Sequence, residues 1–279
     1  MQKLKILLYS IAMVLSSCTR DENIKYPLLF HNIDTTDKVS VKLKAINQAN
    51  LPSPVYYFEY NDSGYITRAG YASGLAFYRV AYAEGRITEM GNMVTVKRDK
   101  LLYKYSSGHP DIISIADSNG FVYRTCYFIY ISTGQLQKID WRMRQPDGSF
   151  IKDLAMEFSY HPDGNLKERI HTYHIDNTQP GILTFTETFE NYDDKINVDG
   201  FRLLHANNNE HLFLTPQLRL QKNNPQRVTR KSLGAGVSYI ANYTYSYNAN
   251  GRPLKKPGDI LFPDSNERFE SQTNYSYYD

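Results

Sequence analysis

The residues best suited to bind a ligand surround the single tryptophan, Trp141. A tryptophan can stack on the apolar face of a sugar ring while polar neighbours, here Arg142 and Arg144, bond to its hydroxyls. Trp141, Arg142 and Arg144 are therefore a candidate glycan platform. Core packing of Trp141 is the competing interpretation. Strand alternation favours it, because it places Trp141 and Met143 on one face and the charges on the other.

The other residues that could carry chemistry do not assemble into a catalytic or metal site. His171 and His174 are three apart, so on a strand they point to opposite faces and cannot share a metal. The segment 193–200 suggests a calcium loop with Asn197 and Asp199 at its third and fifth positions. In that register the first and twelfth positions of the loop fall on Lys195 and Ala206, which supply no carboxylate. We assign no catalytic residue, metal or cofactor and expect a non-enzymatic protein. A glycan hydrolase with carboxylates from separate strands stays open.

The N-terminus has the features of a bacterial lipoprotein signal. Lys3 and Lys5 precede a short apolar run, Ile6 to Leu15, which cannot span a bilayer and suits a secretory signal peptide. The run ends in Leu15-Ser-Ser-Cys18, which resembles the lipobox. That resemblance implies cleavage after residue 17 and acylation of the sulfur and amine of Cys18, which gives stable anchoring. An ordinary signal peptide with a chance cysteine is the alternative.

Residues 18–37 are predicted to be a polar, lipidated tether. Asp21 and Glu22 resemble the surface-export signal of Bacteroidales lipoproteins, although Arg20 interrupts it. We therefore expect an outer-membrane lipoprotein on either the periplasmic or the cell-surface side. Cys126 is then the single remaining thiol, and its aromatic neighbourhood predicts a small buried hydrophobe. A net charge of +3 is too small to indicate a nucleic-acid partner.

A repeat defines the elements that must position any site. Four segments share the spacing aromatic-x-Tyr-x-x-x-Gly: Phe58 to Gly64, Phe128 to Gly134, Phe158 to Gly164 and Tyr245 to Gly251. Aromatic residues two apart share one face of a strand, and turn formers before a glycine predict a hairpin with a type I turn and a bulge. A degenerate copy, 189–196, carries lysine where the glycine should fall.

The spacing of these turns predicts an all-β fold, an antiparallel up-and-down meander of about 12 to 14 strands. Alternation in 151–160 and 38–45 places apolar residues on one face and charges on the other. Such a sheet should curl strongly or close into a barrel-like shape, and its polar outer face indicates a soluble barrel. Residues 38–279 form a single predicted domain, in which 200–240 are expected to be long loops or edge strands.

The motif Tyr-(Asn/Asp)-x-x-Gly-x-(Leu/Ile) is similar to the tyrosine-aspartate repeats of Rhs and teneurin-type shells. Together with the lipobox and the segment 192–197, it makes residues 38–279 resemble a family of Bacteroidales lipoproteins of unknown function with a porin-like antiparallel sheet. The resemblance implies a fold and a location but no activity. Lys195 and the irregular segment 200–240 depart from the pattern.

The sequence therefore predicts a lipoprotein anchored in the outer membrane that acts as a binding module for a glycan or protein partner. The alternatives are a glycan-degrading hydrolase and a structural subunit that pairs with an outer-membrane complex through an open sheet edge. The excess of tyrosine, 24 residues, falls largely before the predicted turns. We interpret it as a cross-strand aromatic ladder rather than a ligand surface.

Overall fold

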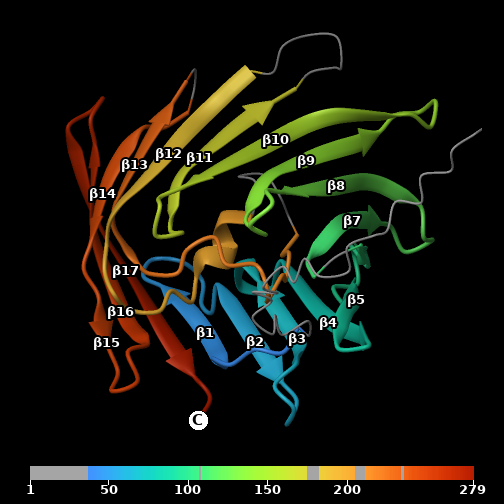
Figure 1. Cartoon of the computed structure of the whole chain (residues 1–279), viewed down its shortest axis with the longest axis horizontal. Coiled ribbons are helices and arrows are strands. Elements are labelled where there is room, and N and C mark those ends of the chain that lie inside the picture. The colour runs from blue at the N-terminus through green and yellow to red at the C-terminus, as the bar shows by residue number, and fades with distance from the viewer. Residues whose placement is uncertain (1–36, 107, 175–181, 205–210, 234–235) are drawn as a thin grey trace, which may run out of the picture. The chain divides into compact units, whose positions relative to one another are not determined.

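The computed structural model describes residues 37–279 except 107, 175–181, 205–210 and 234–235. The described strands form one antiparallel sheet that closes on itself, because β1 pairs with both β2 and β17 (Figure 1). The strands are β1 (Leu43–Gln48), β2 (Tyr56–Tyr60), β3 (Ile66–Tyr71), β4 (Ala76–Ala83), β5 (Arg86–Asn92), β6 (Lys100–Tyr105), β7 (Pro110–Ala116), β8 (Val122–Tyr130), β9 (Leu136–Arg144), β10 (Phe150–Tyr160), β11 (Leu166–Tyr173), β12 (Ile182–Tyr192), β13 (Pro225–Ser232), β14 (Tyr239–Tyr243), β15 (Ser246–Tyr247), β16 (Pro253–Phe262) and β17 (Glu267–Tyr277).

This architecture confirms the all-β, up-and-down prediction and corrects its details. β14 and β15 both pair with β16, so the 17 strands occupy 16 positions, more than expected. The first strand begins at Leu43, and the predicted strand residues Val39 and Val41 precede it. Closure also removes the open sheet edge on which the structural-subunit hypothesis depended, since every described strand except the two-residue β15 is paired on both sides.

The hairpins use the turns that the repeat predicted. In 161–165 the His161 amide donates to the Asn165 carbonyl and the Gly164 amide donates to the His161 carbonyl. Gly164 has a φ of 86°, which glycine adopts without strain. A register shift between Ser159 and Tyr160 marks the bulge. The same arrangement recurs in the turns at 61–65, 131–135 and 248–252.

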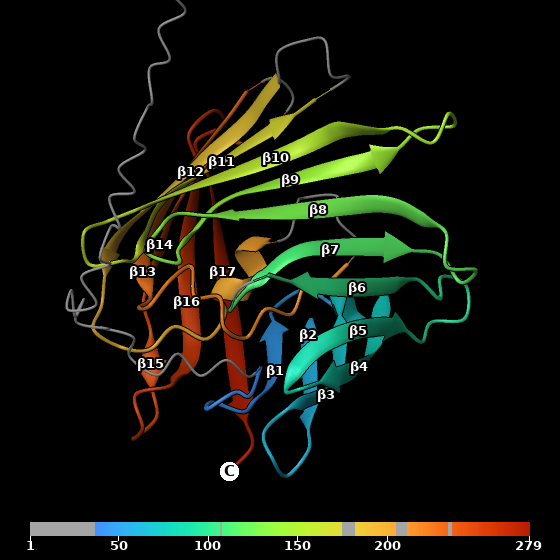
Figure 2. The same cartoon turned by 45° about the vertical axis from the view of Figure 1, so that its right-hand side comes forward.

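Between β12 and β13 the chain leaves the sheet, and residues 193–204 and 211–224 occupy the interior of the barrel; we call these two stretches the plug. It contains the short 3₁₀ helix η2 (Gly200–Leu204) and lies within the ring of strands in both views (Figures 1 and 2). Leu212 and Phe213 are fully buried there. The expected irregular segment is present, but it lies inside the barrel rather than as a surface loop, and β13, which follows it, is paired on both sides rather than at an edge. At Lys195 the turn glycine is missing, and the chain turns inward instead of back.

A tyrosine hydroxyl closes each repeat. Tyr160 ends β10, and its hydroxyl donates to the carbonyl of Leu136, the first residue of β9, at 2.7 Å. Tyr105 departs from this pattern and donates to the carboxylate of Asp37, which also accepts the Ile87 amide. The same bond to the first residue of a preceding strand is made by Tyr60, Tyr82, Tyr130, Tyr192, Tyr245 and Tyr277. The predicted ladder is therefore a ring of hydroxyl-to-carbonyl bonds at one end of the barrel, which we call the tyrosine end.

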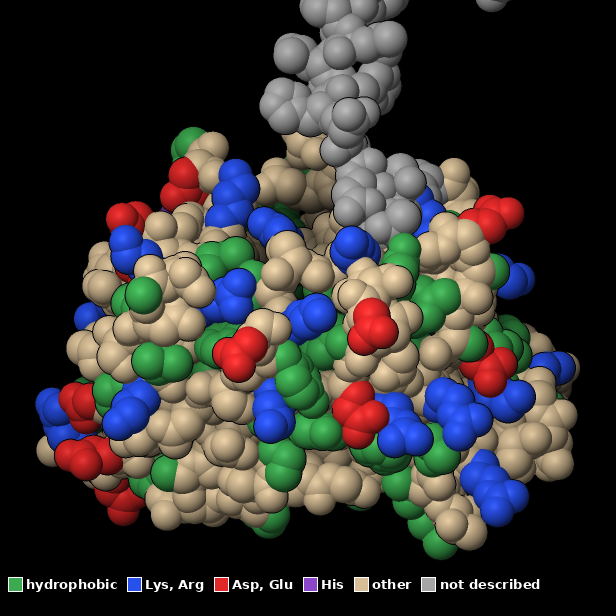
Figure 3. All heavy atoms as spheres, turned by 90° about the horizontal axis from the view of Figure 1, so that it is seen from below, with side chains coloured by type: hydrophobic (Ala, Val, Ile, Leu, Met, Phe, Trp, Pro, Cys, Tyr) green, Lys and Arg blue, Asp and Glu red, His purple; other side chains and the backbone are tan. Residues whose placement is uncertain are grey.

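The outer wall of the barrel is charged. Glu157 bonds to Lys138 on β9 at 2.8 Å, and Asp153 bonds to Arg124 at 2.6 Å. Their β10 neighbours Leu154 and Met156 face inward and are fully buried. Figure 3 shows Lys, Arg, Asp and Glu side chains spread among hydrophobic ones over one face. None of the described residues belongs to a helix long and apolar enough to cross a membrane.

We expect Tyr160→Phe to lower the free energy of unfolding by about 1–2 kcal/mol, because the Leu136 carbonyl loses its hydroxyl donor. Chemical denaturation measures this change. Tyr127→Phe is the matched control: its ring lies against Arg142 on the outer wall, and we expect a change within about 0.5 kcal/mol. Equal effects of the two substitutions would contradict the proposed role of the ring of hydroxyls.

Candidate ligand-binding site

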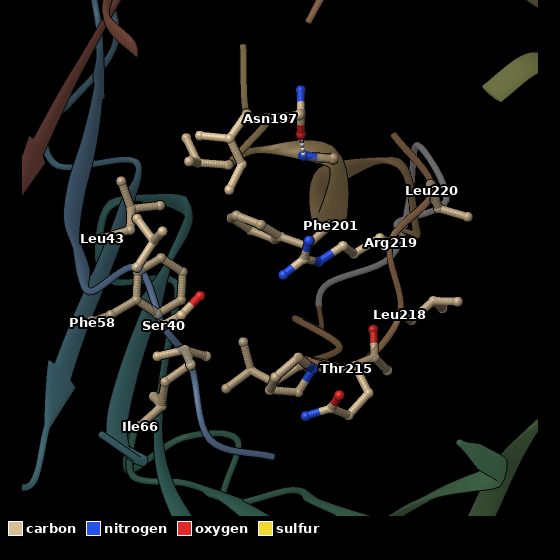
Figure 4. A pocket seen from close by; sticks show the side chains of 18 of the residues that line it. Ser40, Leu43, Phe58, Ile66, Asn197, Phe201, Thr215, Leu218, Arg219 and Leu220 are labelled. Carbon is tan, nitrogen blue, oxygen red and sulfur yellow. Dashed lines mark hydrogen bonds between the residues drawn. The ribbon is translucent and has the colours of Figure 1, made fainter. Parts of the chain in front are cut away.

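A cavity of about 450 Å³ lies between the plug and the inner side of β1–β3 (Figure 4). It is at the tyrosine end, where the chain before β1 passes the first turns: the Val39 amide donates to the Gly64 carbonyl. Two stretches of the plug, 196–201 and 214–221, form the other side. The cavity exists because this part of the plug does not fill the space in front of three strands.

The walls of the cavity are largely apolar. Leu43, Phe58 and Ile66 project inward from β1, β2 and β3 as strand alternation requires. Phe201 of the plug packs edge-on against Phe58, with ring centroids 5.6 Å apart, and Leu218 closes the opposite side (Figure 4). These side chains would accept an aliphatic or aromatic portion of a ligand.

The cavity also holds polar groups without partners in the part of the chain that the structure describes. Arg219 is exposed, makes no ion pair with a described residue, and points into the cavity (Figure 4). Lys38 lies at the margin and is likewise unpaired. Thr215 is 6 % exposed, and its buried Oγ1 has no hydrogen-bond partner. A buried hydroxyl without a partner is costly, so a ligand atom that bonds to it would be favoured.

Charged groups attach the plug to the wall beside this cavity. The carboxylate of Asp199 accepts a bond from the Tyr275 hydroxyl at 2.7 Å and lies 3.4 Å from Lys256 and 3.6 Å from Arg202. Burial raises the pKa of Asp199, but the charges of Lys256 and Arg202 outweigh burial and hold that pKa below its usual range. The plug is thus fixed by a carboxylate that stays ionised inside the barrel.

A second attachment uses the inner face of β11–β13. Arg169 forms a salt bridge with Glu187 and donates to the Leu203 carbonyl of the plug at 2.7 Å. Glu187 also accepts from Tyr239 at 3.0 Å. His171 lies on this face and stacks on Phe185, with centroids 4.5 Å apart. The arginine therefore links a buried carboxylate of the wall to the backbone of the plug.

The third attachment is a histidine of the plug. His211 is buried, with Nδ1 3.0 Å from the Tyr78 hydroxyl and Nε2 3.1 Å from the Tyr123 hydroxyl. Asp99 lies 3.4 Å from the same Nε2. Both ring nitrogens of His211 thus contact tyrosine hydroxyls, and we interpret the cluster as structural. Leu214 adds a backbone bond from its amide to the Tyr103 hydroxyl at 3.2 Å.

The structure does not bring the predicted glycan platform together. Trp141 is fully buried and faces the interior, where it stacks on Phe213 of the plug with centroids 6.2 Å apart. Arg142 and Arg144 lie on the outer wall, over the rings of Tyr127 and Phe121 respectively. Core packing is therefore the correct interpretation of Trp141, because strand alternation separates it from both arginines.

The remaining predicted residues are placed as follows. Cys18 lies outside the described residues. Cys126 is fully buried, and burial raises the pKa of its thiol far above the usual range, so it is an inert core residue. His171 is buried and bonded to Thr184, whereas His174 follows the end of β11. Among the described residues no group of three His, Cys, Asp or Glu side chains could hold a metal.

No pattern in the sequence pointed directly to the cavity. Arg219 and Thr215 belong to the irregular segment 200–240, which no periodicity relates to the strands. The useful clue was the degenerate repeat: Tyr192 has its usual bond to the Leu166 carbonyl, but the turn glycine is missing. A repeat protein that breaks its pattern at one turn has room for an inserted segment with another role.

No protein-family model matches the sequence, and no curated protein matches it. Solved structures do match. A porin-like protein from Bacteroides vulgatus aligns with a TM-score of 0.55 and 17% identity, covering 85% of this chain and 99% of its own. A porin-like protein from Bacteroides uniformis aligns with a TM-score of 0.51 and 13% identity, covering 85% and 95%. The chain shares their fold.

Acidification should weaken the barrel through His171. Burial, followed by the nearby charges of Arg169 and Arg230, lowers the pKa of His171 to about 4 from the 6.5 of a free side chain. The unfolded chain then binds a proton first, so stability falls as the pH drops from about 6.5 towards 4, by up to about 3 kcal/mol. Urea denaturation across this pH range measures the loss.

His171→Phe keeps a ring against Phe185 and leaves the Thr184 hydroxyl its bond to the carbonyl of residue 171. This substitution should flatten the pH dependence of the free energy of unfolding above pH 4. His161→Phe is the control: His161 lies at the turn after β10, where its Nε2 contacts the Phe189 carbonyl, and the pH dependence of stability should persist in this variant. If the free energy of unfolding of His171→Phe fell with pH as steeply as that of the wild type, this explanation would be contradicted.

Proposed function

We propose that this protein is a non-enzymatic binding module, held at the outer membrane by lipid on Cys18, whose cavity binds a small amphipathic anion. The observation that carries the proposal is the cavity itself. It combines apolar walls, the cation Arg219, which forms no ion pair with any described residue, and the unpartnered hydroxyl of Thr215. Residue type and placement thus favour a ligand with an apolar body and a carboxylate, sulfate or phosphate group.

The interior supports binding rather than passage of solutes. The plug contributes Leu204, Leu212 and Phe213 to the same buried core as the wall, so the barrel encloses packed side chains at these positions. Charged groups beside the cavity, such as Asp199, are engaged in holding the plug. They leave Arg219, Thr215 and the marginal Lys38 among the polar groups available to a ligand.

The hydrolase alternative needs two carboxylates that face a common substrate. The carboxylates of the cavity neighbourhood do not have that arrangement, since Asp199 bonds to Tyr275 and Asp193 bonds to Asn224. A glycan ligand remains compatible with the cavity if it is acidic, because Arg219 would bind a uronate as well as a fatty acid. The test therefore includes both kinds of ligand.

The ligand is tested with the fluorescent anion anilinonaphthalenesulfonate and competing compounds. Purified protein should bind the dye saturably, and dodecanoate should displace it. Arg219→Gln should weaken dodecanoate binding about tenfold or more, through loss of a charge-assisted bond. Arg79→Gln, an exposed arginine on β4 away from the cavity, is the matched control and should bind as the wild type does.

Displacement by an oligouronate but not by dodecanoate would assign the cavity to an acidic glycan and overturn the amphipathic ligand. Equal weakening by Arg79→Gln and Arg219→Gln would show nonspecific anion binding. Absence of saturable binding by any of these compounds would contradict a ligand-binding function of the cavity.

The anchor is tested separately. Cys18→Ser should abolish labelling by palmitate and release the protein from the membrane fraction, because the thiol that accepts the lipid is gone. Retention with unchanged labelling would contradict lipid anchoring. Protease added to intact cells then reports the side: digestion places the barrel at the cell surface, and full protection places it in the periplasm.

A further inference from the structure

One end of the barrel carries a ring of exposed hydrophobic side chains. Ten of the thirteen large hydrophobic residues that are exposed in the described part of the chain lie in the loops opposite the tyrosine end, or within three residues of them. Val96 is 88 % exposed and Leu233 is 60 % exposed. We call this set the loop rim: Leu51, Leu75, Met93, Val96, Phe121, Met143, Ile182, Leu233, Val237 and Phe269.

The loop rim extends around the whole barrel. Each of the eight connections at this end, from β1–β2 to β16–β17, has at least one member within it or within three residues of it. Three of the connections, 49–55, 72–75 and 233–238, contain no charged residue. The tyrosine end differs, because its turns read Asn-Asp-Ser-Gly, His-Pro-Asp-Gly and Asn-Ala-Asn-Gly. Single hydrophobic residues are normal on a surface, but a ring confined to one end is not.

We propose that the loop rim docks on a lipid bilayer, with its side chains inserted at the level of the headgroups. A protein partner typically covers one compact patch of about 800 Å². A ring of separate apolar side chains, three of whose eight loops carry no charge, instead suits a continuous apolar phase that every one of them can reach. Arg144, whose guanidinium lies over Phe121 at this end, would then lie at the depth of the lipid phosphates.

The predicted anchor brings a bilayer within reach of this end, so the inference rests on the lipid-anchored part of the proposed function. The chain before β1 joins the barrel at the tyrosine end, where the Asp37 amide donates to the Gly85 carbonyl. From Cys18 to Asp37 there are 37 − 18 = 19 residues, which span at most roughly 65 Å when extended. The longest strands have 11 residues, about 36 Å. The tether is therefore long enough to let the opposite end touch the anchoring membrane.

The experiment uses unlipidated protein beginning at residue 19, which contains every strand of the barrel, so docking is measured without the anchor. It is sedimented with vesicles of phosphatidylethanolamine and phosphatidylglycerol. The wild-type chain should bind. The triple substitution Val96→Ser, Leu233→Ser and Val237→Ser should lower the vesicle partition coefficient about tenfold or more, since three inserted side chains are lost.

The matched control removes three exposed hydrophobic residues from the opposite half of the barrel, with Ile129→Ser, Ile131→Ser and Leu254→Ser. It should bind vesicles as the wild type does, and circular dichroism should show both variants folded. Failure of the wild-type chain to bind vesicles, or equal loss in the two variants, overturns the proposal. A dimer in sedimentation that the loop-rim variant abolishes would assign the rim to a second copy instead. Palmitate labelling of Cys18 is independent of all these outcomes.

Discussion

The need to fill a wide barrel governs this structure. Barrels of about eight strands are filled by their own side chains, whereas barrels of about 16 leave a lumen. Here the lumen is occupied by the chain itself, and Phe213 of the plug stacks on the wall residue Trp141. The sheet can close at 16 positions as a stable fold because the plug completes its core.

The plug in turn explains why charged residues occur inside the barrel. A polypeptide segment with little regular structure brings backbone groups and polar side chains into the core, and each needs a partner. Arg169 satisfies the Leu203 carbonyl while Glu187 neutralises the arginine, and Tyr275 and Lys256 do the same for Asp199. The cavity lies where this fit between plug and wall is incomplete, which is why the candidate ligand site and the plug attachments are neighbours.

The sequence was most informative where one rule repeats. The spacing from Phe158 to Gly164 predicts a hairpin with inward aromatic residues, and seven tyrosines share the same hydroxyl bond. Strand alternation also predicted the burial of Trp141. These successes depend on local geometry, because turn type and face are determined by neighbours in the sequence.

The plug and the cavity were not predictable in this way. Residues such as Arg219 and Thr215 acquire their positions from packing against β1–β3, which are more than 140 residues away (215 − 71 = 144). The loop rim could not be predicted from the sequence either, since each loop has only one or two exposed hydrophobic residues in it or beside it, and single exposed hydrophobic residues are common. Only closure of the barrel places them at one end.

The central claim is that the plug is part of the folded core. Amide hydrogen exchange tests it most directly at Leu212, Phe213 and Leu214, which are buried in the interior. We expect these amides to exchange as slowly as those of β10, through global unfolding. Exchange of the plug at the rate of an exposed loop, while the strands remain protected, would contradict this account.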